Sequence, residues 1–298
     1  MRIAVSGAGG LIGSALAEAL AGDGHEVVRL VRHAPKHDGE VAWDPAAGTV
    51  DTDGLAGCEA VVHLAGAGIG DRRWTEDRKK VLRDSRVRGT GTIARAVASM
   101  PTPPSVLVCG SAIGYYGDTG DRWVDEDSPP GRGFLADLVV EWEAAADPAR
   151  EAGIRTVHAR TGLVVARGGG AWAPLFPIFR AGLGGRLGSG RQFWSFISLH
   201  DEIAALRFLI DTPSLSGPVN LTAPDPLTNR EITKAMGKVL HRPTLAAVPA
   251  PVLRTVLGEF AGDVLSSQRV RPGRLLDAGF TWAHPEIQQA VKEALRVF

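Results

Sequence analysis

The chain is poor in cysteine and carries no excess charge of either sign. Only Cys58 and Cys109 occur among its 298 residues, and both lie in apolar stretches. Their surroundings predict buried thiols in a reducing compartment and argue against a disulfide framework or a metal site. Lys plus Arg and Asp plus Glu each number 33, so the formal net charge is zero. This balance argues against a nucleic-acid partner.

Long hydrophobic runs are also missing. No apolar stretch reaches the roughly 18 to 20 residues that a membrane-spanning helix needs. The first apolar run follows a single positive charge, Arg2, and is soon broken by glycines, unlike the run of a signal peptide. We therefore expect no membrane partner and a cytoplasmic location. The hydrophobic content of 44% and the charged content of 22% are ordinary for a soluble enzyme.

A glycine-rich segment near the N-terminus is the most informative motif. Residues 3–5 form an apolar run typical of a buried parallel strand, and a helical pattern covers residues 11–20. The turn between them has the spacing G-x-x-G-x-x-G, made by Gly7, Gly10 and Gly13. Because Gly9 also satisfies G-x-G-x-x-G, the spacing alone does not choose between the two patterns. The strand before and the helix after the glycines indicate a dinucleotide-binding turn, and a plain strand–turn–helix is the alternative.

Each glycine of this turn has a physical role in such a site. Gly7 allows a sharp turn, Gly10 lets the backbone approach a pyrophosphate, and Gly13 lets the helix pack closely on its strand. The N–H groups at the helix N-terminus favour phosphate. We therefore predict a cofactor site that includes Gly7, Gly10, Leu11, Ile12 and Gly13.

The end of the second expected strand, residues 25–31, bears on the choice of cofactor. In dinucleotide-binding folds an acidic residue at this point hydrogen-bonds the ribose 2′-OH of NAD, whereas an arginine accommodates the 2′-phosphate of NADP. Here Arg32 follows the strand and no Asp or Glu stands beside it. We predict that Arg32 binds NADP(H), and a solvated surface arginine is the alternative.

Strand and helix patterns alternate along the first half of the chain. Further strands are expected near residues 41–43, 59–66, 105–110 and 154–159, with helices at 75–99 and 134–152. This alternation predicts an α/β fold with a Rossmann-type doubly wound parallel sheet and right-handed crossovers. We assign residues 1–165 to an NADP-binding Rossmann domain. Residues 166–298 form a smaller mixed α/β substrate-binding region, and whether it interleaves with the first is left open.

The strand near residues 59–66 ends in Leu64, Ala65 and Gly66. Small residues at the carboxyl end of a strand let a cofactor approach the backbone, so we add these three to the predicted cofactor site. His63 lies within the same run, and we interpret it as a core histidine rather than a catalyst.

Several motifs together resemble a known family. Ser6-Gly7-x-x-Gly10-x-x-Gly13, His63-Leu64-Ala65-Gly66, Ser111-Ala112-Ile113-Gly114-Tyr115-Tyr116-Gly117 and Arg160-Thr161-Gly162 are similar to those of extended short-chain dehydrogenases/reductases. More narrowly, segments such as Arg73-Trp74-Thr75, Trp142-Glu143 and Asn220-Leu221-Thr222-Ala223-Pro224 resemble atypical members of the epimerase family, the nucleoside-diphosphate-sugar epimerase-like proteins. The resemblance covers nearly the whole chain and implies a bound NADP(H).

The expected catalytic motif of that family is absent. Typical members use Ser, Tyr and Lys, with Tyr-x-x-x-Lys on one helix, where the lysine lowers the tyrosine pKa. Here Tyr115 and Tyr116 are the only tyrosines, and no lysine occurs between Lys80 and Lys234. The equivalent helix positions carry Phe134 and Leu138.

The resemblance still implies candidates for catalysis: Ser111, Tyr115 and Tyr116. One of the two tyrosines should pack inward, and the sequence does not say which. Ser111 is also expected to contact the cofactor, with a capping role in a turn as the alternative. The resemblance further places Arg160 near the nicotinamide edge or a substrate anion. The helix expected at 134–152 also carries three carboxylates, Asp137, Glu141 and Glu143, which we interpret as an exposed acidic face.

Two functions follow from this combination of features. The first is an NADP(H)-dependent oxidoreductase or sugar-nucleotide epimerase-like enzyme with a non-standard acid/base group. Its substrate is unknown and would be a sugar nucleotide or another carbonyl or alcohol. The second is a catalytically silent NADP(H)-binding sensor or regulator. The helices expected at 75–99 and 134–152 could also pair in a homodimer.

Overall fold

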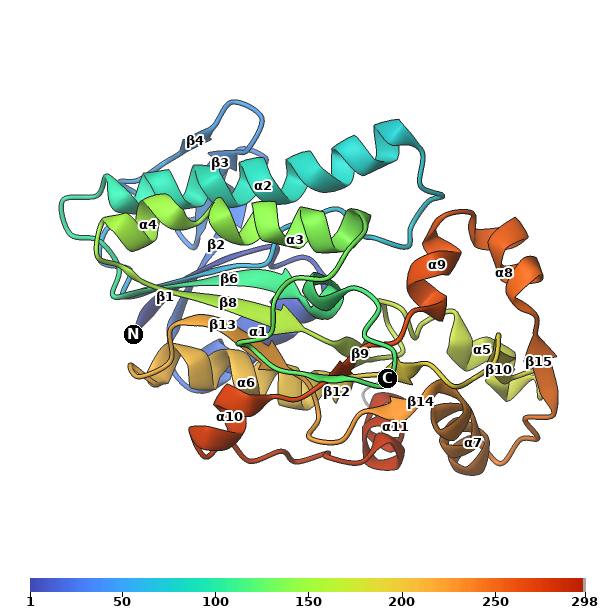
Figure 1. Ribbon diagram of the computed structural model, residues 1–298. Helices are drawn as coiled ribbons and strands as arrows, with labels where there is room; N and C mark the ends of the chain where they lie inside the picture. Colours follow the sequence, from blue (N-terminus) through green and yellow to red (C-terminus); the bar gives the residue numbers. More distant parts are fainter. Residues whose placement is uncertain (297–298) are drawn as a thin grey trace.

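Eight strands form a central sheet in the computed structural model, which describes residues 1–296 (Figure 1). The strand order is β13-β8-β6-β5-β1-β2-β3-β4, and every neighbouring pair is parallel except β3 and β4. The strands are β1 (Arg2–Ser6), β2 (Glu26–Val31), β3 (Glu40–Asp44), β4 (Thr49–Val50), β5 (Ala60–His63), β6 (Val106–Ala112), β8 (Arg155–Thr161) and β13 (Gly217–Leu221). This is the doubly wound Rossmann-type sheet that the sequence predicts.

Helices cover both faces of the sheet, as Figure 1 shows. One face carries α1 (Leu11–Gly22) and α6 (Leu199–Asp211), and the other carries α2 (Glu76–Ala98), α3 (Phe134–Ala144) and α4 (Asp147–Glu151). The alternation of side chains along β1 explains the two layers. Ile3 and Val5 pack with α1 and α6, whereas Ala4 packs with α2 and α4. A strand buried on both faces is apolar throughout, which is why its sequence shows no polar alternation.

Most of the remaining elements form a lobe at the carboxyl edge of the sheet, towards the right of Figure 1. Its core contains Trp172, Phe176, Phe196 and Met236. Four short two-stranded pairings connect its loops: β9 (Leu163–Val165) with β12 (Phe196–Ser198), β10 (Gly185–Leu187) with β15 (Ala246–Val248), β11 (Phe193–Trp194) with β14 (Leu227–Thr228), and β7 (Trp123–Val124) with β16 (Arg269–Val270). The helices of the lobe are α5 (Leu175–Arg180), α7 (Asn229–Leu240), α8 (Ala250–Leu257), α9 (Phe260–Leu265) and α11 (Ile287–Arg296). The short helix α10 (Gly273–Asp277) lies outside the lobe, near α6 at the lower left of Figure 1, and its Leu275 packs in the core on the α1 face of the sheet.

The two halves of the sequence share the central sheet. Both α6 and β13 lie beyond residue 165, yet β13 pairs with β8 and α6 covers one face of the sheet. The division of the chain at residue 165 into two domains stays a prediction.

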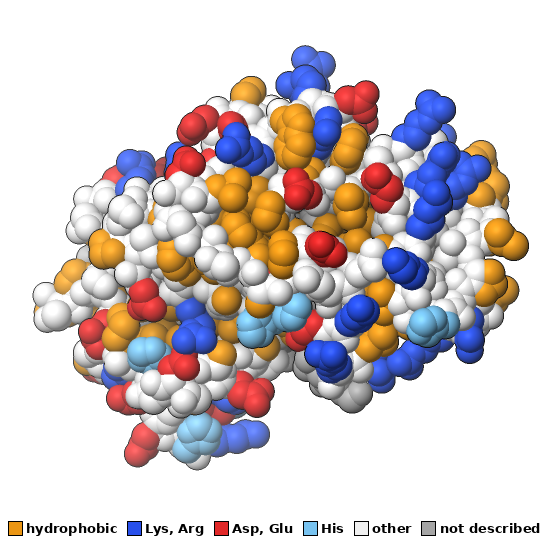
Figure 2. Space-filling model, turned by 90° about the horizontal axis from the view of Figure 1, so that it is seen from below, with side chains coloured by type: hydrophobic (Ala, Val, Ile, Leu, Met, Phe, Trp, Pro, Cys, Tyr) orange, Lys and Arg blue, Asp and Glu red, His pale blue; other side chains and the backbone are white. Residues whose placement is uncertain are grey.

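The surface mixes charges of both signs. On the underside shown in Figure 2, basic side chains are most frequent over the right-hand part, where the lobe of α5, α7 and α8 lies. Within residues 1–296, no helix combines the length and the apolar character needed to cross a bilayer.

Candidate cofactor and active site

The glycine turn has the geometry that its sequence predicts. Gly7 has φ +71°, and a Cβ added there would lie 2.9 Å from the amide nitrogen of Ala65. The N–H of Gly10 donates to the carbonyl of Gly7 at 2.9 Å, which closes the turn. A Cβ at Gly13 would overlap that same carbonyl oxygen. The turn therefore requires glycine at Gly7 for conformation and contact, and at Gly13 for close packing of helix on strand.

The start of α1 suits a bound phosphate. Gly10 is the N-cap residue, and no side chain caps the helix there. A Cβ added at Gly9 would meet no atom within 4 Å, so this side of the turn is open. The uncapped N–H groups and the helix dipole favour an anion at this position. Of the other predicted residues, Leu11 faces the 168–170 loop, where a Cβ at Gly169 would lie 3.4 Å from the Cβ of Leu11, and Ile12 is half-buried.

The end of β5 is fixed against the end of β1 by Ser6. The Ser6 hydroxyl accepts hydrogen bonds from the N–H groups of Leu64 at 3.1 Å and Ala65 at 3.3 Å. It also lies 2.7 Å from Nδ1 of His63. Burial lowers the pKa of His63 to about 4, so the ring is neutral at pH 7. The structure thus places His63 in the core, as interpreted from the sequence, and leaves Leu64 and Ala65 beside Gly7, whereas Gly66 lies against Arg86.

Arg32 follows β2 directly and is exposed. Its guanidinium has no hydrogen bond or ion pair within the part of the chain that the structure describes. A free arginine at this strand end is compatible with a phosphate ligand. Its preference for the NADP phosphate stays a prediction.

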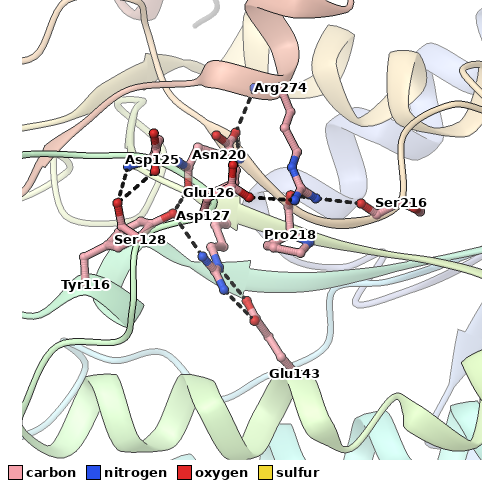
Figure 3. Close-up of polar contacts among 11 residues, drawn as sticks. Tyr116, Asp125, Glu126, Asp127, Ser128, Glu143, Ser216, Pro218, Asn220 and Arg274 are labelled. Atoms are coloured by element: carbon pink, nitrogen blue, oxygen red, sulfur yellow. Dashed lines mark hydrogen bonds and ion pairs between the residues drawn. The ribbon is translucent and has the colours of Figure 1, made fainter.

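A buried polar cluster lies at the carboxyl ends of β6 and β8 (Figure 3). The hydroxyl of Ser111 donates to Oε1 of Glu143 at 2.6 Å. Arg160 binds the same carboxylate through two nitrogens, each at 2.8 Å from an oxygen. Burial alone lowers the pKa of Arg160, but its hydrogen bonds and charge interaction with Glu143 outweigh burial and hold the pKa above its ordinary value. Ser111 and Arg160, both predicted as site residues, are therefore joined through a carboxylate.

The two tyrosines have different environments. Tyr116 is buried; its hydroxyl donates to Oδ1 of Asn220 at 2.8 Å and accepts from Arg160 at 3.0 Å. Burial raises the pKa of Tyr116 to about 12. Tyr115 is half-buried, its ring faces the Arg160 guanidinium at 3.5 Å, and its hydroxyl has no partner within residues 1–296. Tyr116 is thus the inward-packing tyrosine, and Tyr115 has the available hydroxyl.

The cluster continues into the C-terminal part of the chain. The backbone N–H of Asn220 on β13 donates to Oε1 of Glu126 at 2.9 Å, and the N–H of Arg274 donates to the same oxygen at 3.3 Å. Figure 3 shows Glu126 and Asn220 on the far side of Tyr116 from Glu143. The network therefore fixes the loop after β6 to β13 and to the start of α10.

Sequence reasoning missed the central member of this cluster. Glu143 was expected on an exposed acidic face, yet its side chain is only 13% exposed. One signal could have identified it. Arg160 lies near the end of a strand with buried positions, and most buried arginines in proteins pair with a carboxylate. Nothing in the sequence indicates the roles of Glu126 or Asn220.

The N-terminal half of α3 holds the positions where the family resemblance places Tyr and Lys. Phe134 is half-buried there and packs against Trp74, with 5.2 Å between ring centroids, while Leu138 is buried. The ammonium of Lys79 lies 5.5 Å from the Phe134 ring centroid. A surface hollow of about 410 Å³ between α2, α4 and the turn after β3 includes none of the predicted site residues.

Comparison with known proteins agrees with this geometry. The "NAD dependent epimerase/dehydratase family" matches residues 3–221, and the "Domain of unknown function (DUF1731)" matches residues 248–294. The epimerase family protein Mb2239 of Mycobacterium bovis is 47% identical over 290 residues, covering 97% of this chain and 96% of its own. The human epimerase family protein SDR39U1 is 37% identical over 297 residues, covering 98% and 99% of the two chains. A crystal structure of human SDR39U1 isoform 2 with NADPH has a TM-score of 0.91 and 35% identity over both complete chains.

Proposed function

Because the chain belongs to the NAD-dependent epimerase/dehydratase family, we propose that it binds NADP(H) and uses it as an oxidoreductase on a carbonyl or alcohol substrate. The human relative crystallised with NADPH supports this choice of cofactor. The open glycine turn and the free Arg32 support it independently. A sugar nucleotide is one substrate of this class.

The cofactor site is proposed from residues around the ends of β1, β2 and β5. The N–H groups at the start of α1 would hold the pyrophosphate, and Arg32 would hold the 2′-phosphate. When bound, NADP(H) supplies or accepts a hydride. The protein must then accept or return the proton of the substrate hydroxyl.

The hydrogen bond from Ser111 to Glu143 is the observation that carries the proposed chemistry. A serine hydroxyl has one proton to donate, and here that proton is directed to a carboxylate at 2.6 Å. Ser111 therefore presents lone pairs to a ligand and is suited to accept a hydrogen bond from an alcohol. In alcohol oxidation, the alcohol proton moves to Ser111 as the serine proton moves to Glu143, so one proton leaves the substrate with the hydride. Carbonyl reduction reverses both transfers.

Tyr115 is the second group available to the substrate. Its hydroxyl is unpartnered within residues 1–296, and the Arg160 guanidinium lies against its ring. This stacking holds the Tyr115 ring in place beside Ser111 and leaves its hydroxyl free to hydrogen-bond a substrate. Tyr116 is a positioning residue, because both of its hydrogen bonds are to protein groups.

Cofactor titration tests the binding half of the proposal. The protein should bind NADPH more tightly than NADH by isothermal calorimetry, and Arg32→Ala should remove the preference. Arg254→Ala changes an exposed arginine of α8 and is the matched control. Equal affinity of the wild-type protein for the two cofactors would reject the Arg32 assignment.

Turnover tests the chemical half. NADPH consumption is followed with a library of carbonyl compounds that includes nucleotide sugars. Ser111→Ala should lower the rate by about 100-fold or more, as loss of the proton-transferring group does, and Tyr115→Phe should lower it less. Cofactor binding without consumption of any library member would favour a silent NADP(H)-binding protein, which the absence of Tyr and Lys from α3 supports.

A further inference from the structure

Arg86 on α2 is a buried cation without a carboxylate partner in residues 1–296. Its relative exposure is 9%, and it makes no ion pair. Its Nη1 donates to two backbone carbonyls, Ala67 at 2.9 Å and Leu82 at 3.3 Å. Its guanidinium also stacks on Trp142, with 5.1 Å to the ring centroid. Carbonyls and an aromatic face only partly compensate a buried charge.

Two nitrogens of this guanidinium are available to a ligand. Nε and Nη2 have no hydrogen-bond partner within residues 1–296, and neither is sealed from solvent. An arginine side chain whose stem and one nitrogen are fixed presents its remaining donors in a defined direction. Such an edge matches the two oxygens of a carboxylate or phosphate.

The position of Arg86 relates it to the proposed site. A Cβ added at Gly66 would lie 3.4 Å from the guanidinium carbon of Arg86, so the guanidinium is beside the backbone that follows β5. In the sheet β5 lies between β1 and β6. Arg86 is therefore adjacent to the segment between the glycine turn and Ser111.

A second arginine increases the positive charge around the same loop. Arg78 donates to the carbonyl of Gly68, and its nearest carboxylate, Asp71, is 3.7 Å away and 69% exposed. Burial, together with the charge of Arg78, lowers the pKa of Arg86 to about 10. Arg86 remains charged at pH 7 but lacks the stabilisation that a counter-ion would supply.

We propose that Arg86, assisted by Arg78, binds an anionic group of a ligand at the carboxyl end of β5. The group is a phosphate or carboxylate, contributed either by the cofactor or by the substrate. The proposal rests on the proposed NADP(H) function, since it places the anion beside that cofactor site. The ligand anion would also supply the counter-ion that the buried guanidinium of Arg86 lacks.

The test compares Arg86→Met and Arg86→Lys with Arg83→Met, the matched control. Arg83 lies one turn earlier on α2, is exposed, and pairs with Glu141 on the surface. Calorimetry measures NADPH binding to each protein, and inorganic phosphate binding to each protein free and saturated with NADPH. Thermal unfolding is measured without ligand.

Arg86→Met should weaken anion binding by about 10- to 100-fold, the effect of losing a charged hydrogen bond. Arg86→Lys should retain part of the affinity, and Arg83→Met all of it. The free Arg86→Met protein should unfold at the wild-type temperature or higher, because an unpaired buried charge has been removed. A purely structural arginine would instead lower the unfolding temperature without changing ligand affinity.

The two sources of the anion give different results. Weaker NADPH binding, with phosphate competing against NADPH, assigns the anion to the cofactor. Unchanged NADPH binding, with phosphate affinity lost in the NADPH complex, assigns it to the substrate.

If Arg86→Met changes neither affinity, or if Arg86→Lys loses as much affinity as Arg86→Met and unfolds at a lower temperature, the proposal is wrong. A wild-type protein that does not bind NADPH refutes the proposed function, whereas phosphate binding to the free protein still tests Arg86.

Discussion

At the scale of single residues, the buried pair of Glu143 and Arg160 organises the candidate active site. The side chains are 13% and 3% exposed, and two hydrogen bonds of 2.8 Å join them. Removing one member of such a pair leaves a buried charge without its partner. The pair therefore constrains where Ser111 and both tyrosines can point.

Glu143→Gln should lower the free energy of unfolding by about 3 kcal/mol, because Arg160 would lose its counter-ion. Glu141→Gln, two residues earlier on α3, removes an exposed partner of Arg83 and should cost at most about 1 kcal/mol. Urea unfolding of both variants measures the difference. A similar loss of unfolding free energy in the two variants would mean that the buried pair stabilises the protein no more than the exposed pair does.

His63 makes stability depend on pH. Its pKa is about 4 in the folded protein because of burial, against 6.5 in the unfolded chain. Between these values the unfolded state binds more protons, so the stability present above pH 6.5 is lost as the pH falls towards 4. The contribution is about 3 kcal/mol. Urea unfolding from pH 7 to pH 4.5 should show a steeper loss for the wild type than for His63→Gln; parallel losses would exclude the histidine as the cause.

At the scale of elements, the sequence predicted the long, periodic segments well. The helix expected at 75–99 is α2 (Glu76–Ala98), with Thr75 as its N-cap. The helix expected at 134–152 is instead broken into α3 and α4. The break precedes Pro148, which begins a new helix readily but cannot continue an old one.

The short strands and the site contacts were not predictable in the same way. The two-residue strands β7 and β16 are too short to show any periodicity, and they pair residues about 146 positions apart in the chain. The bond between Tyr116 and Asn220 likewise joins residues 104 positions apart. Local sequence patterns specify helices and strands, whereas contacts between residues far apart in the chain depend on the tertiary fold.

The junction of β1 and α1 gives a prediction at this scale. Gly13→Ala should destabilise the protein by about 1 to 3 kcal/mol, because the added Cβ would overlap the Gly7 carbonyl oxygen. It should also weaken NADPH binding by moving the start of α1. Gly22→Ala places a Cβ in open space at the other end of α1 and should be neutral or slightly stabilising. Thermal unfolding and calorimetry of both variants test the contrast, and equal behaviour would contradict it.

At the scale of the whole molecule, the sheet depends on segments from both halves of the sequence. The hydrophobic core on the α1 face includes Leu206 and Leu209 of α6 and Val219 of β13. A chain that ends at residue 165 would lack all of them and would expose the free edge of β8. Exposed strand edges and apolar faces promote association.

A fragment of residues 1–165 should therefore form soluble oligomers or aggregate, measured by size-exclusion chromatography with light scattering. A fragment of residues 1–222 includes α6 and β13 and should contain more monomer. A monomeric, cooperatively folding 1–165 fragment would instead support the predicted division into two domains at that residue.

β13 is synthesised well after its partner strand β8, and this delay bears on folding during translation. β8 ends at Thr161 and its partner begins at Gly217, 56 residues later. At roughly 5 to 20 residues per second, a ribosome needs roughly 3 to 11 seconds to synthesise that interval. During this time the edge of β8 is open on every nascent chain. Translation speed across residues 162–217 should therefore influence the yield of folded protein, and chaperones that bind extended apolar segments have their opportunity there.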